Sequence, residues 1–201
     1  MPAQVIPFAN KQPPQPFVPR AFVGFSASGG IGRIIRLFTG GSVNHAFIIY
    51  YDMEYATWMT VGANANGVTM LPIAQFVPGR TIVALYEPKG FSLWDGLRTH
   101  VSDLGKHYDY AGLFGMAFVE IERRLHSRGL CNILDHRDDL FCSEWAAEVI
   151  DSALACAGQT MLADFPLAGT RPDVIDPQWL CDTLKGSELF VPVPTAAIMG
   201  K

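Results

Sequence analysis

The sequence lacks the signals of several protein classes. It has no run of 18 or more apolar residues, so no membrane-spanning helix is expected. Residues 1–20 lack a basic start followed by an apolar stretch, which predicts synthesis in the cytoplasm without a signal peptide. Only four cysteines occur in 201 residues, and none forms a Cys-x-x-Cys pair. A chain of this length needs no disulfides to fold, so we expect these cysteines to be thiols.

Charge of either sign is also scarce. The chain carries 15 Lys and Arg against 19 Asp and Glu, which gives a net charge of −4. No basic cluster is present, so nucleic acid and anionic membrane surfaces are not expected as partners. Hydrophobic residues make up 49% of the chain, enough for one domain with an apolar core.

Three regions differ in composition. Residues 1–20 contain six prolines, which predicts an extended arm. Residues 21–186 contain the periodic apolar segments and form the expected domain. The tail at 187–201 is apolar and contains prolines, and we expect it to be loosely attached.

Segments with strand character come first and segments with helix character come after them. The expected strands are 21–27, 45–51, 55–61, 67–73 and 81–88. The expected helices are 31–39, 92–105, 110–125, 142–157 and a short one that begins near Asp176. This grouping predicts an α+β fold in which a small antiparallel sheet packs on helices.

Cys142 stands at the first position of the expected helix at 142–157. Backbone amides and the dipole at a helix N-terminus favour the thiolate over the thiol. A cysteine in this position can also be an inert core residue. A nucleophilic thiolate needs a partner that takes its proton, which is usually a histidine.

Among the five histidines, His45 has the most suitable position, because it begins an apolar strand after a Gly-Ser turn. A residue on the next strand should orient its ring. If the hairpin turns at Asp52–Met53, Thr60 lies opposite His45, and Asn64 is the other polar residue nearby. A threonine can hold a histidine tautomer but does not stabilise an imidazolium as a carboxylate does.

Five segments, in this order, resemble the circularly permuted papain-like NlpC/P60 superfamily: NHAFIIYYD, VGANANGVTMLPI, YDYAGLFG, FCSEWAAEVIDSALACAG and DPQWLCDTL. The likeness covers about residues 21–185 and is greatest to the YiiX-like and lecithin-retinol-acyltransferase-like branch, including bacteriophage-encoded members. It implies a cofactor-free cysteine hydrolase or acyltransferase, with Cys142 as nucleophile and His45 as base. Backbone amides would hold the oxyanion. Substrates in this superfamily are amides, thioesters and esters, often cell-wall peptides or lipids.

Other residues allow more than one interpretation. Glu144 either tunes the site or is a first-turn acid that the helix dipole favours. Tyr108 either lines the cleft or packs in the core. His126, Cys131, His136 and Cys142 could together bind zinc, but their spacing fits no compact zinc motif, and we expect no metal. The glycine-rich SASGGIGR lacks a phosphate-loop pattern and is interpreted as a cleft rim.

These patterns support two functions. The first is a thiol hydrolase, encoded by a phage and associated with its virion or tail. The second is a non-catalytic structural or interaction module of a phage or bacterial assembly, which keeps the fold and docks on other proteins through residues 1–20 and 187–201. The reactivity of Cys142 distinguishes them, since only a nucleophile should react much faster than the other cysteines.

Overall fold

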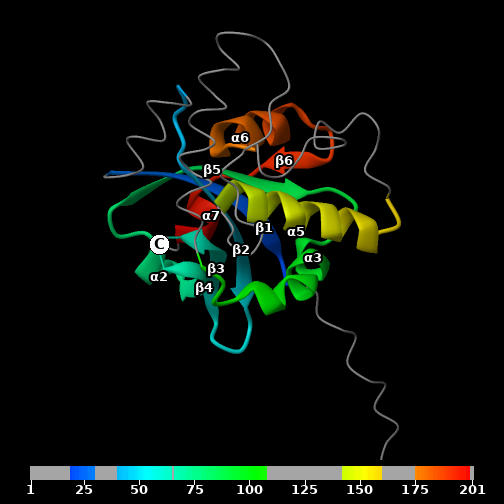
Figure 1. The fold of residues 1–201 in the computed structure, drawn as a ribbon, viewed down its shortest axis with the longest axis horizontal. Coiled ribbons are helices and arrows are strands. Elements are labelled where there is room, and N and C mark those ends of the chain that lie inside the picture. The colour runs from blue at the N-terminus through cyan, green and yellow to red at the C-terminus, as the bar shows by residue number, and fades with distance from the viewer. Residues whose placement is uncertain (1–18, 30–39, 65, 108–141, 160–174, 200–201) are drawn as a thin grey trace, which may run out of the picture.

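A computed structural model describes residues 19–29, 40–64, 66–107, 142–159 and 175–199 (Figure 1). The helices expected at 31–39 and 110–125 lie outside these residues, as does most of the proline-rich arm.

The centre of the described fold is one six-stranded antiparallel sheet with the strand order β4-β3-β2-β1-β5-β6. The strands are β1 (Ala21–Ser28), β2 (His45–Asp52), β3 (Thr57–Asn64), β4 (Gly67–Pro72), β5 (Arg80–Pro88) and β6 (Phe190–Pro192). The first five were expected from the sequence, with β3 shifted along the chain. The expected α+β fold is confirmed.

Helices flank this sheet. They are α2 (Ile73–Phe76), α3 (Leu93–Thr99), the 3-10 turn η1 (Val101–Asp103), α5 (Cys142–Cys156), α6 (Pro177–Gly186) and α7 (Ala196–Met199). Two predicted starts are confirmed, because the side chains of Ser92 and Asp176 accept hydrogen bonds from backbone amides in the first turns of α3 and α6. No helix among the described residues is long and apolar enough to cross a membrane.

Helix α3 is shorter than expected. The sequence predicts a helix over 92–105, but α3 ends at Thr99 and the separate turn η1 comes after it. The Thr99 hydroxyl donates a 2.7 Å hydrogen bond to the carbonyl of Gly96, and the His100 backbone leaves the helical region (φ −102°, ψ 13°). The break places His100 and Asp103 beside α5.

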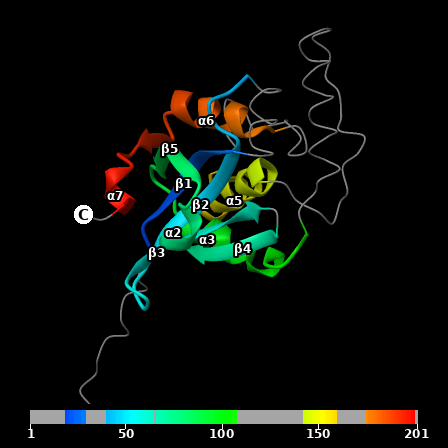
Figure 2. The ribbon, with the colours of Figure 1, turned by 90° about the vertical axis from the view of Figure 1, so that its left-hand side faces the viewer.

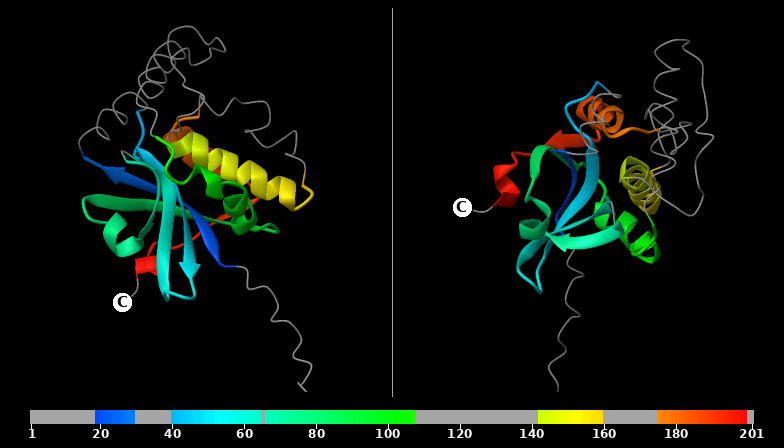
Figure 3. Two further views of the ribbon diagram at one scale, coloured as in Figure 1. Left: turned by 60° about the horizontal axis from the view of Figure 1, so that its bottom comes forward. Right: turned by 60° about the vertical axis from the view of Figure 1, so that its left-hand side comes forward.

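Two apolar clusters cover the two faces of the sheet. Helices α3 and α5 lie on one side of the sheet and α7 lies on the other (Figures 2 and 3). The larger cluster joins alternate residues of β1 and β2 to α3, α5 and α6, with Trp145 as its largest fully buried side chain. The smaller cluster contains Phe22, Phe47 and Ile49 with Phe76 of α2 and Ile198 of α7. Residues of β2 alternate between these faces, which explains its continuous apolar sequence.

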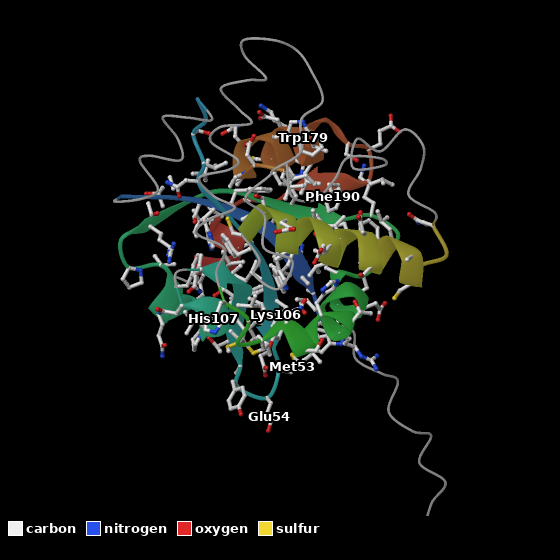
Figure 4. The ribbon with its side chains drawn as sticks, in the orientation of Figure 1. Met53, Glu54, Lys106, His107, Trp179 and Phe190 are labelled. Atoms are coloured by element: carbon white, nitrogen blue, oxygen red, sulfur yellow. The ribbon has the colours of Figure 1, made fainter. Side chains whose placement is uncertain are left out.

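The predicted pairing of β2 with β3 is wrong by four positions. Thr60 lies opposite Ile49, and continuing this register places Asn64 opposite His45. The cause is the loop, which has four residues, 53–56, instead of a tight turn at Asp52–Met53. The Asp52 carboxylate accepts hydrogen bonds from the amides of residues 54 and 55 and stabilises this longer loop, whose tip carries Met53 and Glu54 (Figure 4).

The expectation of a loosely attached tail is also wrong for its described residues. Phe190–Pro192 forms β6, which pairs with the end of β5. Phe190 is buried and its ring lies 5.5 Å from that of Phe91 in an edge-on contact. Ile198 is buried on the other face of the sheet. Phe190 and Ile198 of the tail are therefore part of the core.

Candidate thiol site

Cys142 is the first residue of α5, a helix of 15 residues that packs on the larger apolar cluster. Its side chain is buried, as are those of the next residues through Ala147. The Ser143 hydroxyl donates a 2.5 Å hydrogen bond to the carbonyl of Ile175, which ties the start of α5 to the segment before α6. Cys142 is therefore held at a fixed point with the positive end of the helix dipole beside it.

Three strands bring polar residues to one end of the sheet. In the pairing of β1 with β2, Ser26 lies opposite His45. In the pairing of β1 with β5, Ser28 lies opposite Arg80. Asn44 joins the first two strands here, because its amide nitrogen donates to the Ser28 carbonyl and its amide oxygen accepts from the Ser28 amide. The end of β1 and the first residues of β2 and β5 are thus held together.

The His45 imidazole is buried among aromatic rings. It stacks on Phe47 at 6.0 Å between ring centroids and lies 5.7 Å from the ring of Phe76. Burial lowers the pKa of His45 to about 3, and the positive charge of Arg80 contributes to the shift. The ring is therefore neutral at neutral pH.

Arg80 connects His45 to Cys142 electrostatically. Its guanidinium lies over the ring of Phe76, 4.7 Å from the centroid. Burial lowers the pKa of Arg80, and the negative charge of a Cys142 thiolate acts in the opposite direction. No carboxylate among the described residues forms an ion pair with it. Arg80 is thus a half-buried cation close to both members of the expected pair.

Two buried polar atoms at this end of the sheet have no hydrogen-bond partner among the described residues. They are the Ser26 hydroxyl oxygen and Nε2 of His45, on directly opposite positions of β1 and β2. Buried polar atoms without partners are rare in folded proteins and often mark functional sites. Arg80, whose charge acts on both His45 and Cys142, connects these atoms to the thiol in the candidate site.

Ser26 and Arg80 were not predicted from the sequence. Each is a polar residue at the end of an apolar strand, as His45 is, so the same signal was present. The pairing of β1 with β5, which brings Arg80 to this end of the sheet, has no local signal in the sequence.

The expected orienting residues hold neighbouring strands together. Thr60 donates a 3.0 Å hydrogen bond to the carbonyl of Leu71 on β4. Asn64 donates to the Thr69 hydroxyl and accepts from the amide of Asn66, so its side chain fixes the β3–β4 turn. Thr60 does not lie opposite His45, which corrects the arrangement predicted from the sequence.

The remaining candidates are placed only in part. Glu144 is buried in the first turn of α5. Tyr108 and three residues of the zinc alternative, His126, Cys131 and His136, lie outside the described residues. The second half of the glycine-rich segment, from residue 30, lies outside them as well.

A second polar cluster lies between η1 and α5, where ligand atoms of His100, Asp103 and Glu148 come within 4.8 Å of one another. Both ring nitrogens of His100 are engaged, Nδ1 with Asp103 at 2.7 Å and Nε2 with the Ser152 hydroxyl at 2.9 Å. The Lys106 ammonium lies 2.7 Å from the other Asp103 oxygen. His100 and Asp103 already bind each other, a serine of α5 and a lysine. We therefore interpret the cluster as a link between η1 and α5 and not as a metal site.

No protein-family model and no curated protein matches the chain. A solved structure does: YiiX from Escherichia coli O157:H7, described as a metalloprotein, with a TM-score of 0.53 and 17% sequence identity. The match covers 88% of this chain and 96% of that one. This likeness shows a shared α+β fold. The circular permutation and the bacteriophage branch stay predictions.

Proposed function

We propose that this protein is a thiol hydrolase or acyltransferase with Cys142 as its nucleophile. The observation that carries the proposal is the position of Cys142 at the start of α5, with its charge coupled to that of Arg80. The thiolate sulfur would attack the carbonyl carbon of an acyl substrate, the bond from that carbon to the leaving nitrogen or oxygen would break, and the leaving group would take a proton from water. Water or another acceptor would then release the acyl group from the sulfur.

The surrounding groups support distinct parts of this reaction. Arg80 would supply the positive charge that stabilises the thiolate, because His45 is neutral at neutral pH. Nε2 of His45 has no partner among the described residues and could accept a proton only transiently, given its pKa of about 3. Backbone amides at the start of α5 would hold the oxyanion. Asn64 lies opposite His45 in the extended register, but its side chain is engaged with Thr69 and Asn66, so Phe47 and Phe76 are the described side chains that hold the His45 ring.

For the substrate we propose an amide or ester of the cell-wall peptide or lipid type, in keeping with the sequence resemblance. Attachment to a virion through residues 1–20 and 187–201 is part of the same proposal. Strand β6 and Ile198 already pack against the domain, so these parts of the tail are less suited to contact a virion.

The thiol chemistry can be tested by alkylation with iodoacetamide as a function of pH, followed by mass mapping of each labelled cysteine. Cys156 is exposed and serves as an internal reference, and Cys181 is buried and serves as a measure of accessibility. Labelling of Cys142 should reach its plateau at a lower pH than labelling of Cys156. Coincident profiles for Cys142 and Cys156 would contradict a stabilised thiolate.

Variants connect the reactivity to function. Hydrolysis of p-nitrophenyl acetate should be lost in Cys142→Ala. Arg80→Gln should move the Cys142 labelling profile to higher pH, and Arg80→Lys should restore most of it. Arg98→Gln removes an exposed cation of α3 and is the matched control. If Arg80→Gln and Arg98→Gln shift the Cys142 labelling profile equally, Arg80 does not specifically stabilise the thiolate.

One observation favours the alternative of a non-catalytic interaction module. The His45 ring is enclosed by Phe47 and Phe76, and its low pKa makes it a weak base. In that case Cys142 should label slowly at every pH, as a buried core thiol does. Cys142→Ala should then leave binding to partner proteins unchanged.

A further inference from the structure

A cavity of about 320 Å³ lies between α3, η1 and α5 on one side and strands β2–β4 on the other. Its volume is within the range of small-molecule sites in proteins. None of Cys142, His45 and Arg80 lines it. The cavity is therefore a feature separate from the thiol site.

Aromatic and sulfur-containing side chains form the walls. The rings of Tyr50 and Trp94 lie 5.1 Å apart, and the Tyr50 hydroxyl donates to the sulfur of Met70 at 3.4 Å. Trp145 lines the cavity from α5. Flat rings and a methionine sulfur make their best contacts with another aromatic ring, so the walls favour a planar aromatic group over a flexible aliphatic chain.

Two polar groups of the lining suit an anionic ligand. Trp145 is only 1% exposed, and its indole N–H has no hydrogen-bond partner among the described residues. A buried tryptophan N–H normally has a partner. Arg98 contributes an exposed cation to the same lining and forms no ion pair with a described carboxylate.

We propose that this cavity binds a small aromatic carboxylate. The ring would lie against Tyr50, Trp94 and Met70. The carboxylate would accept from the Trp145 N–H and face the Arg98 guanidinium. This site does not depend on the chemistry of Cys142.

The test is a titration of the full chain with 2-naphthoate, monitored by isothermal titration calorimetry and by tryptophan fluorescence. We expect saturable binding of the wild-type chain with one site. Trp145→Phe keeps a ring but removes the N–H, and Arg98→Gln removes the charge. Trp145→Phe should weaken binding about tenfold or more, as expected for loss of a hydrogen bond to a charged group, and Arg98→Gln, which removes an exposed charge, about twofold to fivefold. Val101→Trp, at an exposed position of the lining, should block the cavity and abolish binding.

Matched variants separate this site from other surfaces. Trp58→Phe changes a tryptophan that packs with the smaller cluster, and Lys185→Gln removes an exposed cation of α6. Neither should change the affinity. Cys142→Ala should also bind normally, which separates this proposal from the thiol chemistry. Absence of saturation at millimolar 2-naphthoate, equal losses in Lys185→Gln and Arg98→Gln, or tighter binding of decanoate would each overturn the proposal.

Discussion

At the scale of single residues, the most consequential feature is a neutral imidazole inside an aromatic cluster. His45 lies against Phe47 and Phe76 and close to the charge of Arg80. Protonation would place two positive charges in one poorly hydrated region. The folded protein therefore resists the protonation of His45, whereas the unfolded chain does not.

This difference predicts a dependence of stability on pH. The pKa of His45 is about 3 in the folded protein and about 6.5 in the unfolded chain, so between these values the unfolded state binds more protons. The free energy of unfolding should fall as the pH falls from about 6.5 towards 3, by at most about 5 kcal/mol at 1.36 kcal/mol for each pH unit. Urea denaturation at several pH values measures this loss.

The matched comparison for that measurement is His45→Gln against His107→Gln. His107 is exposed, so its removal should leave the pH dependence as in the wild-type protein. His45→Gln should flatten the curve between about pH 3 and about pH 6.5. If the free energy of unfolding depends on pH equally in both variants, groups other than His45 cause the loss of stability at low pH.

Part of this site was predictable because two of its signals are local. Cys142 directly begins a helix, and His45 directly begins an apolar strand, so each can be recognised from its neighbours in the sequence. Ser26 comes beside His45 through the pairing of β1 with β2, and Arg80 reaches the site through the pairing of β1 with β5, which are far apart in the sequence. Polarity at a strand end does not reveal which other strand end will lie beside it.

At the scale of elements, the contact between α3 and α5 is made possible by Gly96. A side-chain carbon at this position would lie 2.1 Å from the Val149 carbonyl oxygen and 3.0 Å from the Ala153 side chain. The two helices therefore approach closely at this point. The cluster of His100, Asp103 and Ser152 joins the same two parts of the chain.

Gly96→Ala should destabilise the protein, because the added methyl group clashes with backbone that cannot move independently of α5. We expect a loss of about 2–3 kcal/mol in the free energy of unfolding, measured in urea. Gly186→Ala is the control, since nothing lies within 4 Å of the added carbon. It should be neutral or slightly stabilising. Similar losses in both would mean that α3 and α5 do not cross at Gly96.

The pairing of β2 with β3 shows where prediction of elements fails. The apolar pattern identified both strands, but the register depended on the loop between them. Asp52 stabilises a four-residue loop through two hydrogen bonds. Because of this loop, the β3 partner of each β2 residue lies four positions away from the predicted one. The shift is even, so each residue of β3 stays on the face of the sheet that the predicted register gave it.

At the scale of the whole molecule, the C-terminal segment joins both faces of the sheet. Phe190 belongs to the larger cluster and Ile198 to the smaller one. Phe190 and Trp179 come from β6 and α6 (Figure 4). The sequence indicated an apolar tail but not its contacts, because a short strand containing proline has little pattern of its own.

The contribution of this segment can be measured with Phe190→Ala. Loss of a buried aromatic side chain should reduce the free energy of unfolding by about 3–5 kcal/mol. Val191→Ala, at the next and more exposed strand position, should cost much less. If the segment were loosely attached, both variants would unfold at the same urea concentration as the wild-type protein.

The strand order also matters while the chain is being made. β1 pairs with β2 on one edge, but its other partner, β5, begins at Arg80, 52 residues after Ser28. At about 5–20 residues per second, that edge stays unpaired for roughly 3–10 s during translation. The apolar β1 is therefore open to pairing with neighbouring nascent chains for seconds. A ribosome-bound chaperone that shields it would raise the yield of folded protein.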